Sequence, residues 1–165
     1  MEELGKRGDA NAQMRLGLMF YDGEDTSVDK AKAAFWFMQA SQRGLAEAKY
    51  RLSGMLFQGD GVEADEEYAM TFLIQAAEQG HPESMYNVGV KKYLGQGVPI
   101  DRNAAAEWFL RAAEAGLPQA QNNIGWMMIV GDSVRPNVEA GRGWLKEAAA
   151  AGNSDAKFTL ASLGA

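Results

Sequence analysis

Residues 105–116 read Ala-Ala-Glu-Trp-Phe-Leu-Arg-Ala-Ala-Glu-Ala-Gly, and closely similar stretches recur along the chain at a fixed interval. The last residue of this stretch belongs to a series of glycines spaced 36 residues apart, formed by Gly8, Gly44, Gly80, Gly116 and Gly152. A large aliphatic column keeps the same interval without insertion or deletion, at Leu16, Leu52, Val88, Ile124 and Leu160. An interval of this length is typical of repeat proteins, in which each repeat is one supersecondary unit.

Each repeat has the pattern of two helices joined by a loop. In the first helix, apolar residues recur four residues apart, as at Ala48, Leu52 and Leu56, and in the second they recur at i, i+3, i+4 and i+7. The second helix begins at a residue whose side chain can accept from free N–H groups of the first turn, namely Asp29, Asp65, Asp101 and Asn137. Because a two-helix repeat cannot bury its apolar face alone, we expect an all-α fold in which the repeats stack into a superhelix, an α/α solenoid.

The predicted organisation is a single domain spanning residues 1–165, with four helix-turn-helix repeats and partial repeats at both ends. The repeats are placed at approximately 9–44, 45–80, 81–116 and 117–152, and a C-terminal capping helix at 153–165. Since both ends fall inside partial repeats, the sequence is expected to be either a fragment of a longer protein or a protein with half-repeat caps.

Small residues are abundant, and we expect them to let neighbouring helices approach closely. Glycine recurs in the first helix at Gly17, Gly89 and Gly125. One aromatic residue of each second helix is expected to fill the gap between the helices, at Trp36, Phe72, Trp108 and Trp144.

Composition excludes several classes of function. The 165 residues are 47% hydrophobic and 23% charged, with a formal net charge of −6 and no cysteine. This balance is typical of a folded globular protein, and the acidic charge argues against nucleic acid as a partner. Without cysteine there is no disulfide, thiolate metal site or cysteine nucleophile. The N-terminal residues contain no apolar segment of a signal peptide, and no run is long enough for a membrane helix, so the sequence predicts a soluble protein.

No residues with the pattern of a catalytic or metal site are found. His81, the only histidine, lies between Gly80 and Pro82 and is expected to be an exposed linker residue. Acidic residues at 22–29 and 60–67 do not have the spacing of a calcium-binding loop and are expected to be solvated helix caps. The sequence therefore predicts no enzyme activity, no cofactor and no metal.

The unit Ala120-Gln121-Asn122-Asn123-Ile124-Gly125, continued by residues such as 95–101 and 105–116, resembles the Sel-one-like repeat family, relatives of tetratricopeptide repeats. The resemblance covers the chain from about Gly8 to Leu163. It implies an α/α solenoid that acts as a scaffold or adaptor in protein–protein assembly, is common in bacteria, and has no enzyme activity of its own. It also suits a periplasmic or secreted location if a signal peptide has been removed.

By the same resemblance, the first helices should line a concave surface, and their outward columns are the candidate binding site for a protein or peptide. One of these columns holds Met14, Tyr50, Tyr86 and Asn122. From all the columns the candidate binding residues are Arg15, Tyr50, Arg51, Tyr86, Asn87, Asn122, Asn123 and Trp126. Asn side chains can pair with both a peptide N–H and a C=O, aromatic rings provide rigid apolar area, and Arg can bind a carboxylate.

Two questions stay open at the level of sequence. The recurring Tyr50, Tyr86, Asn87 and Asn123 suit either packing between repeats or ligand binding. The alternative functions are a carbohydrate or cell-wall binding module, suggested by the aromatic and Asn content, and an inhibitor or immunity-type partner of a basic effector, suggested by the net charge of −6.

Overall fold

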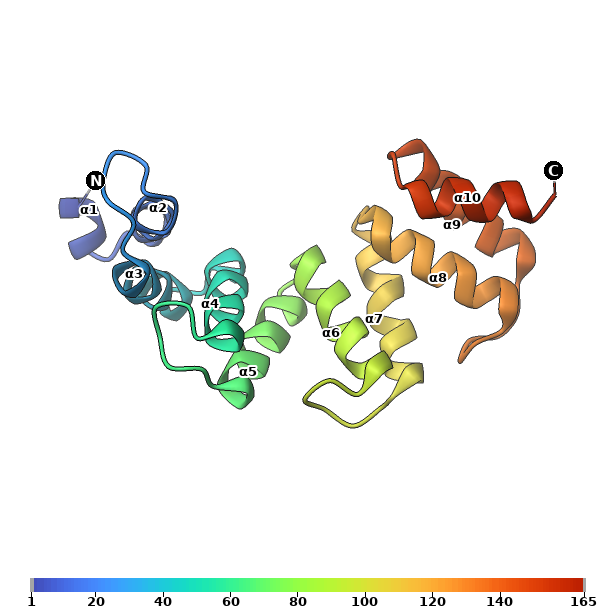
Figure 1. Cartoon of the computed structure of the whole chain (residues 1–165), viewed down its shortest axis with the longest axis horizontal. Coiled ribbons are helices and arrows are strands. Elements are labelled where there is room, and N and C mark those ends of the chain that lie inside the picture. The colour runs from blue at the N-terminus through green and yellow to red at the C-terminus, as the bar shows by residue number, and fades with distance from the viewer. Residues whose placement is uncertain (1, 165) are drawn as a thin grey trace. The chain divides into compact units, whose positions relative to one another are not determined.

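A computed structural model describes residues 2–164, and this range folds into ten α-helices without any strand (Figure 1). The helices are α1 (Glu2–Lys6), α2 (Ala10–Asp22), α3 (Lys30–Gln42), α4 (Ala46–Gln58), α5 (Glu66–Glu78), α6 (Pro82–Leu94), α7 (Arg102–Glu114), α8 (Pro118–Val130), α9 (Val138–Ala150) and α10 (Ser154–Ser162). The predicted all-α fold of paired helices is confirmed. Residues 1 and 165, where the expected domain and its capping helix end, lie outside the described residues. Between residues 2 and 164, none of the helices has the length and apolar character needed to cross a membrane.

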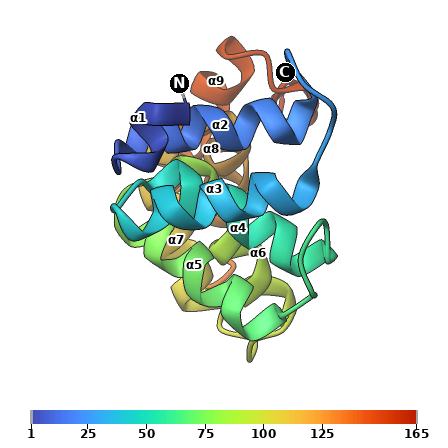
Figure 2. The same cartoon turned by 90° about the vertical axis from the view of Figure 1, so that its left-hand side faces the viewer.

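The helices belong to two compact units, unit 1 (residues 1–81) and unit 2 (residues 82–165). In unit 1, helices that are consecutive in the chain pack against each other from α1 to α5, as Figure 2 shows for α1, α2 and α3. In unit 2 the same order runs from α6 to α10. Within each unit a second helix, α3 in unit 1 and α7 in unit 2, therefore contacts its own first helix and the first helix that follows it.

The N-termini of the helices are stabilised by the residue types found there. Asp29, Asp65, Asp101 and Asn137 each accept a hydrogen bond from a backbone N–H three residues later, with N···O distances of 2.9–3.0 Å. Each such cap contributes about 1 kcal/mol to helix stability. Pro82 and Pro118 begin α6 and α8, where the missing N–H of proline leaves no bond unmade.

Close approach of the two helices in a repeat depends on the glycine column, as predicted. A Cβ added to Gly17 would lie 2.4 Å from Cε1 of Phe37, and one added to Gly89 would lie 2.8 Å from the Phe109 ring. The ring that fills the gap thus comes from the residue after the expected aromatic, since Phe37 and Phe109 follow Trp36 and Trp108. The prediction was therefore wrong by one residue for the ring that meets the glycine in the first and third repeats, whereas the expected aromatics Trp36 and Phe72 are themselves buried.

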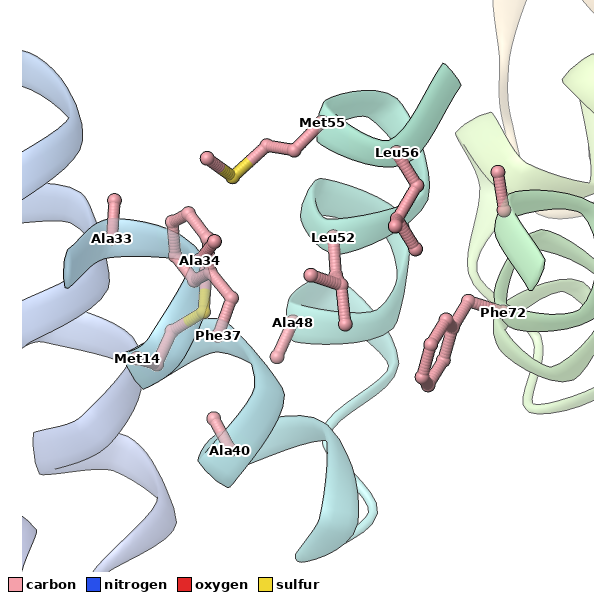
Figure 3. Close-up of a cluster of buried hydrophobic side chains, with 11 residues drawn as sticks. Met14, Ala33, Ala34, Phe37, Ala40, Ala48, Leu52, Met55, Leu56 and Phe72 are labelled. Carbon is pink, nitrogen blue, oxygen red and sulfur yellow. The ribbon is translucent and has the colours of Figure 1, made fainter. Parts of the chain in front are cut away.

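The apolar core of unit 1 gathers around Phe37. Figure 3 shows this ring with Met14, Leu52 and Met55 in a cluster drawn from α2, α3, α4 and α5. Met14 belongs to this cluster and is buried, so its placement among the outward columns is corrected. A flexible thioether fills the irregular space beside an aromatic ring, whereas the same column holds Tyr86 and Asn122 in unit 2.

The first two repeats are joined by a charged side chain held between a ring and a carboxylate. Lys30 at the start of α3 places its Nζ 3.0 Å from the centroid of the Tyr21 ring and 3.4 Å from Oδ2 of Asp60. Tyr21 and Lys30 belong to the first repeat and Asp60 to the loop of the second. We call this arrangement the inter-repeat clasp. It combines a cation–π contact with an ion pair.

A second inter-repeat clasp joins the last two repeats in unit 2. The Arg102 guanidinium lies 5.0 Å from the centroid of the Tyr93 ring and its Nη1 4.0 Å from Oδ1 of Asp132. Here the tyrosine also takes part directly, because its hydroxyl donates to Oδ2 of Asp132 at 2.5 Å. In the second repeat, Phe57 holds the position of the tyrosine and Glu66 that of the cation. In the third repeat, Gln96 holds the position of the aspartate.

Candidate binding site

Unit 2 contains a pocket of about 450 Å³ that brings together four of the eight candidate binding residues. Tyr86 enters it from α6, and Asn122, Asn123 and Trp126 enter from α8. The described residues that line it are Tyr86, Val90, Tyr93, Leu94, Phe109, Asn122, Asn123, Trp126, Met127 and Thr159. Its size lies in the range of small-molecule and side-chain sites, which are concave and mostly apolar.

The spacing of residues on α6 explains why its side chains share one wall. Tyr86, Val90, Tyr93 and Leu94 follow each other at i, i+4, i+7 and i+8, which places them on one face of a helix. The candidate binding residues included Tyr86 but not Tyr93 or Leu94, although this spacing predicts that they share its face. Leu94 remains 53% exposed, so an apolar surface borders the pocket.

The opposite wall carries the polar groups of the pocket. Nδ2 of Asn122 donates to Oδ1 of its neighbour Asn123 at 3.4 Å. Oδ1 of Asn122 is buried and accepts no hydrogen bond from any residue between 2 and 164. Trp126, one turn further along α8, is 42% exposed. A buried acceptor beside an exposed indole is a suitable place for a ligand that has both a donor and an apolar group.

The inter-repeat clasp of unit 2 fixes one side of this pocket. Tyr93 lines the pocket with its ring while its hydroxyl donates to Asp132. This hydrogen bond raises the pKa of Tyr93 and lowers the pKa of Asp132. Ser133 also donates to Asp132, at 3.0 Å. The loop before α9 is thereby tied to α6, and the Tyr93 ring is held in position.

In unit 1, the corresponding candidates Tyr50 and Arg51 take part in contacts within the protein. The His81 ring lies against Tyr50 with a centroid separation of 4.7 Å, and its Nε2 donates to Oε2 of Glu47 at 2.8 Å. Nε of Arg51 donates to the other carboxylate oxygen of Glu47 at 2.6 Å. The hydrogen bond from His81, followed by that from Arg51, lowers the pKa of Glu47 to about 2.

The expectation that His81 is an exposed linker residue was therefore wrong, since only 11% of its side chain is exposed. The turn before Pro82 directs the imidazole back onto α4, where a ring and a carboxylate receive it. Among the remaining candidates, Arg15 is exposed on α2 and Asn87 is half-buried on α6, and neither lines the pocket of unit 2.

Thr159 is the pocket residue that the sequence analysis missed most completely. It comes from α10, the helix expected to act as a cap. Its position matches Asn123 after one repeat interval, so it continues the column of Asn87 and Asn123 into the last helix. Within residues 2–164, no group of three or more His, Asp or Glu side chains is arranged to hold a metal ion.

The paired helices at a constant interval and the pocket between first helices define an α-helical repeat protein with a potential binding site. The Sel1 repeat profile matches residues 10–45, 46–81, 82–117 and 118–153, and the chain belongs to the Sel1 repeat family. Proteins of this family are generally scaffolds for protein interactions, and the fold is typically non-catalytic.

Two solved bacterial structures are similar over nearly the whole chain. A Sel1 repeat protein from Oxalobacter formigenes is 36% identical with a TM-score of 0.94, and the match covers 97% of this chain and 46% of that one. The protein c5321, a protective antigen of uropathogenic Escherichia coli with an SLR fold, is 25% identical with a TM-score of 0.88, covering 96% and 34%. This chain thus spans less than half the length of either protein. No curated protein matches it.

Proposed function

We propose that this chain is a non-enzymatic scaffold that binds an extended segment of a protein partner in the pocket of unit 2. The observation that carries this proposal is the meeting of Tyr86, Asn122, Asn123 and Trp126 in one cavity. Amide side chains can pair with a peptide N–H and C=O, and aromatic side chains provide rigid apolar area for a ligand. In this function the first helices present the binding surface, as in other solenoids of paired helices.

The test is selection of binders from a random 12-residue peptide library displayed on phage, with the intact chain as bait. Trp126→Ala removes the exposed indole of the pocket, and Phe35→Ala is the matched control because Phe35 is an exposed aromatic residue on α3. We expect selected peptides to bind the wild type and Phe35→Ala equally and Trp126→Ala about 30-fold more weakly. Peptides that bind all three proteins equally would contradict the location of the site.

A carbohydrate is the second candidate ligand, because Trp126 offers an exposed ring beside two amide side chains. Calorimetric titration with chitobiose and cellobiose separates the two functions. Heat of binding that disappears in Trp126→Ala, together with a peptide library that yields no binders, would replace the peptide proposal by a glycan-binding function.

The charge distribution supports a basic protein as partner. Residues 1–81 contain 14 acidic and 8 basic side chains, whereas residues 82–165 contain 8 of each, so the whole net charge of −6 belongs to the first half. An acidic surface accelerates association with a cationic partner, and salt screens this effect. For a basic partner, the association rate should fall steeply between low and physiological salt. The same holds if the partner is a basic effector that this chain inhibits. A rate independent of salt would exclude charge steering.

A further inference from the structure

Among the residues that the structure describes, those that line the pocket of unit 2 carry no ionised side chain. These ten residues are apolar, aromatic, amide or hydroxyl residues. Asp132 is adjacent through Tyr93, but its carboxylate is already bound by the hydroxyls of Tyr93 and Ser133. A charged ligand group entering this pocket would lose water without gaining a counter-ion, which is strongly unfavourable.

The arginines that were expected to bind a carboxylate do not contribute to this site. Arg51 is bound to Glu47 at 2.6 Å in unit 1, and Arg15 lies on α2 of the same unit. Neither a terminal carboxylate nor an acidic side chain therefore finds a cationic partner among the pocket residues. The chemistry of the site favours an uncharged group.

One polar atom of the pocket lining nevertheless lacks a hydrogen-bond donor among the described residues. Oδ1 of Asn122 is buried without a hydrogen bond from the described part of the chain, while Nδ2 of the same amide is used by Asn123. A buried acceptor left without a partner is costly, and a ligand N–H would remove that cost. The rings of Tyr86, Phe109 and Trp126 line the same space and can enclose a large apolar side chain.

We infer that the pocket recognises a large uncharged side chain, aromatic or branched aliphatic, in an extended peptide that also donates a backbone N–H to Oδ1 of Asn122. This inference rests on the proposed function and specifies its ligand. Recognition is by an apolar anchor and one hydrogen bond. Acidic anchors and free C-termini are excluded, because the pocket has no cation to pair with them.

The first experiment replaces each residue of a peptide selected by the wild-type chain, in turn, by Leu, Trp, Asp and Lys, and measures the dissociation constants. We expect one anchor position that tolerates Leu or Trp but loses about 100-fold affinity with Asp or Lys. If the peptide is sensitive to Trp126→Ala but prefers a charged residue at its anchor, the peptide-binding function stands and the inferred ligand chemistry is wrong.

The second experiment tests the hydrogen bond by replacing single peptide amides of the same ligand with esters, which lack the N–H. One ester should weaken binding to the wild type about 10-fold. Asn122→Leu should weaken the parent peptide by a similar factor, and the ester should then cause little further loss. Asn103→Leu, an exposed amide on α7 outside the pocket lining, is the matched control and should leave the ester effect unchanged.

Each outcome of the ester series decides the inference. If no ester weakens binding to the wild type, the N–H donation is refuted without recourse to a variant, even if Asn122→Leu folds poorly. If the ester effect and the Asn122→Leu effect multiply, the donor goes to another atom and the assignment to Asn122 is overturned. If the library yields no peptide at all, the failure lies with the proposed function.

Discussion

Tyr50 in unit 1 and Tyr86 in unit 2 hold the same position of their repeats, yet one is covered by a side chain and the other lines a pocket. The His81 ring lies on Tyr50 and is held there by Glu47. The position of His81 in the next repeat is occupied by Leu117, which has no polar atom to bind a carboxylate. Tyr50 thus packs against His81 within the protein, whereas Tyr86 lines the pocket.

The largest effects are expected when the buried phenylalanine of each unit is replaced by alanine. Phe37→Ala and Phe109→Ala each remove a buried ring and should each lower the free energy of unfolding by about 3–5 kcal/mol. Since only Phe109 lines the pocket, only Phe109→Ala should also weaken binding of the selected peptides. Denaturant unfolding and binding at a temperature where both variants are folded measure the two effects. Equal loss of binding in both would remove the distinction between the units.

The next largest effect on the free energy of unfolding is expected from a substitution in the loop before α5. Gly61 has φ +74°, and an added Cβ would lie 2.4 Å from the backbone carbon of Lys30. Gly61→Ala should therefore cost about 3 kcal/mol, through left-handed strain and overlap together. Gly44→Ala is the control, because Gly44 has φ +92° and no atom lies within 4 Å of an added Cβ. This variant therefore has the left-handed backbone strain without the overlap. Equal costs in thermal unfolding would show that the loop moves away from Lys30.

Acid should weaken unit 1 through Glu47. The pKa of Glu47 is about 2 in the folded chain and 4.5 ordinarily, so its contribution to stability is complete above pH 4.5 and disappears as the pH falls toward 2. Because 40% of this side chain is exposed and water screens it, we expect Glu47→Gln to cost only about 1 kcal/mol at neutral pH. Near pH 2 the variant and the wild type should be equally stable. Unfolding curves with parallel pH dependence would contradict the role of His81 and Arg51.

The smallest effects are expected where a repeat lacks its usual glycine. Asp25 and Ser133 both have φ 59° at the position where the middle repeats hold Gly61 and Gly97. Asp25→Gly relieves this conformation and should stabilise unit 1 by about 0.5–1 kcal/mol. In unit 2 the gain from Ser133→Gly should be smaller, because Ser133 also donates to Asp132. Differential scanning calorimetry of the two variants measures the difference, and a larger gain in unit 2 would mean that this hydrogen bond contributes nothing.

The helices and their caps could be predicted from the sequence because they depend on local chemistry repeated at a constant interval. That Asn122, Asn123 and Trp126 lie on one face of α8 could also be predicted from their spacing, and their role in binding stays a prediction. Contacts between repeats were harder to foresee. The hydrogen bond from Tyr93 to Asp132 joins residues 39 positions apart, and that from His81 to Glu47 joins residues 34 apart.

Such contacts depend on the rotation of one helix relative to the next, which a single pattern does not specify. Phe37 illustrates the point: the 3.6-residue period allows either Trp36 or Phe37 to face the first helix, and the glycine at position 17 selects the second.

The inter-repeat clasp also affects which duplications of repeats can lengthen the gene that encodes this chain. Tyr21 and Tyr93 are 72 residues apart, as are Lys30 and Arg102, so the clasp has a period of two repeats. Duplication of a 72-residue segment would give each new copy its cation, ring and carboxylate in register. Duplication of the second repeat alone would place Phe57 and Glu66 before a second copy of Asp60, and two carboxylates would then face each other without a cation. Growth by pairs of repeats therefore keeps one complete clasp in every added segment.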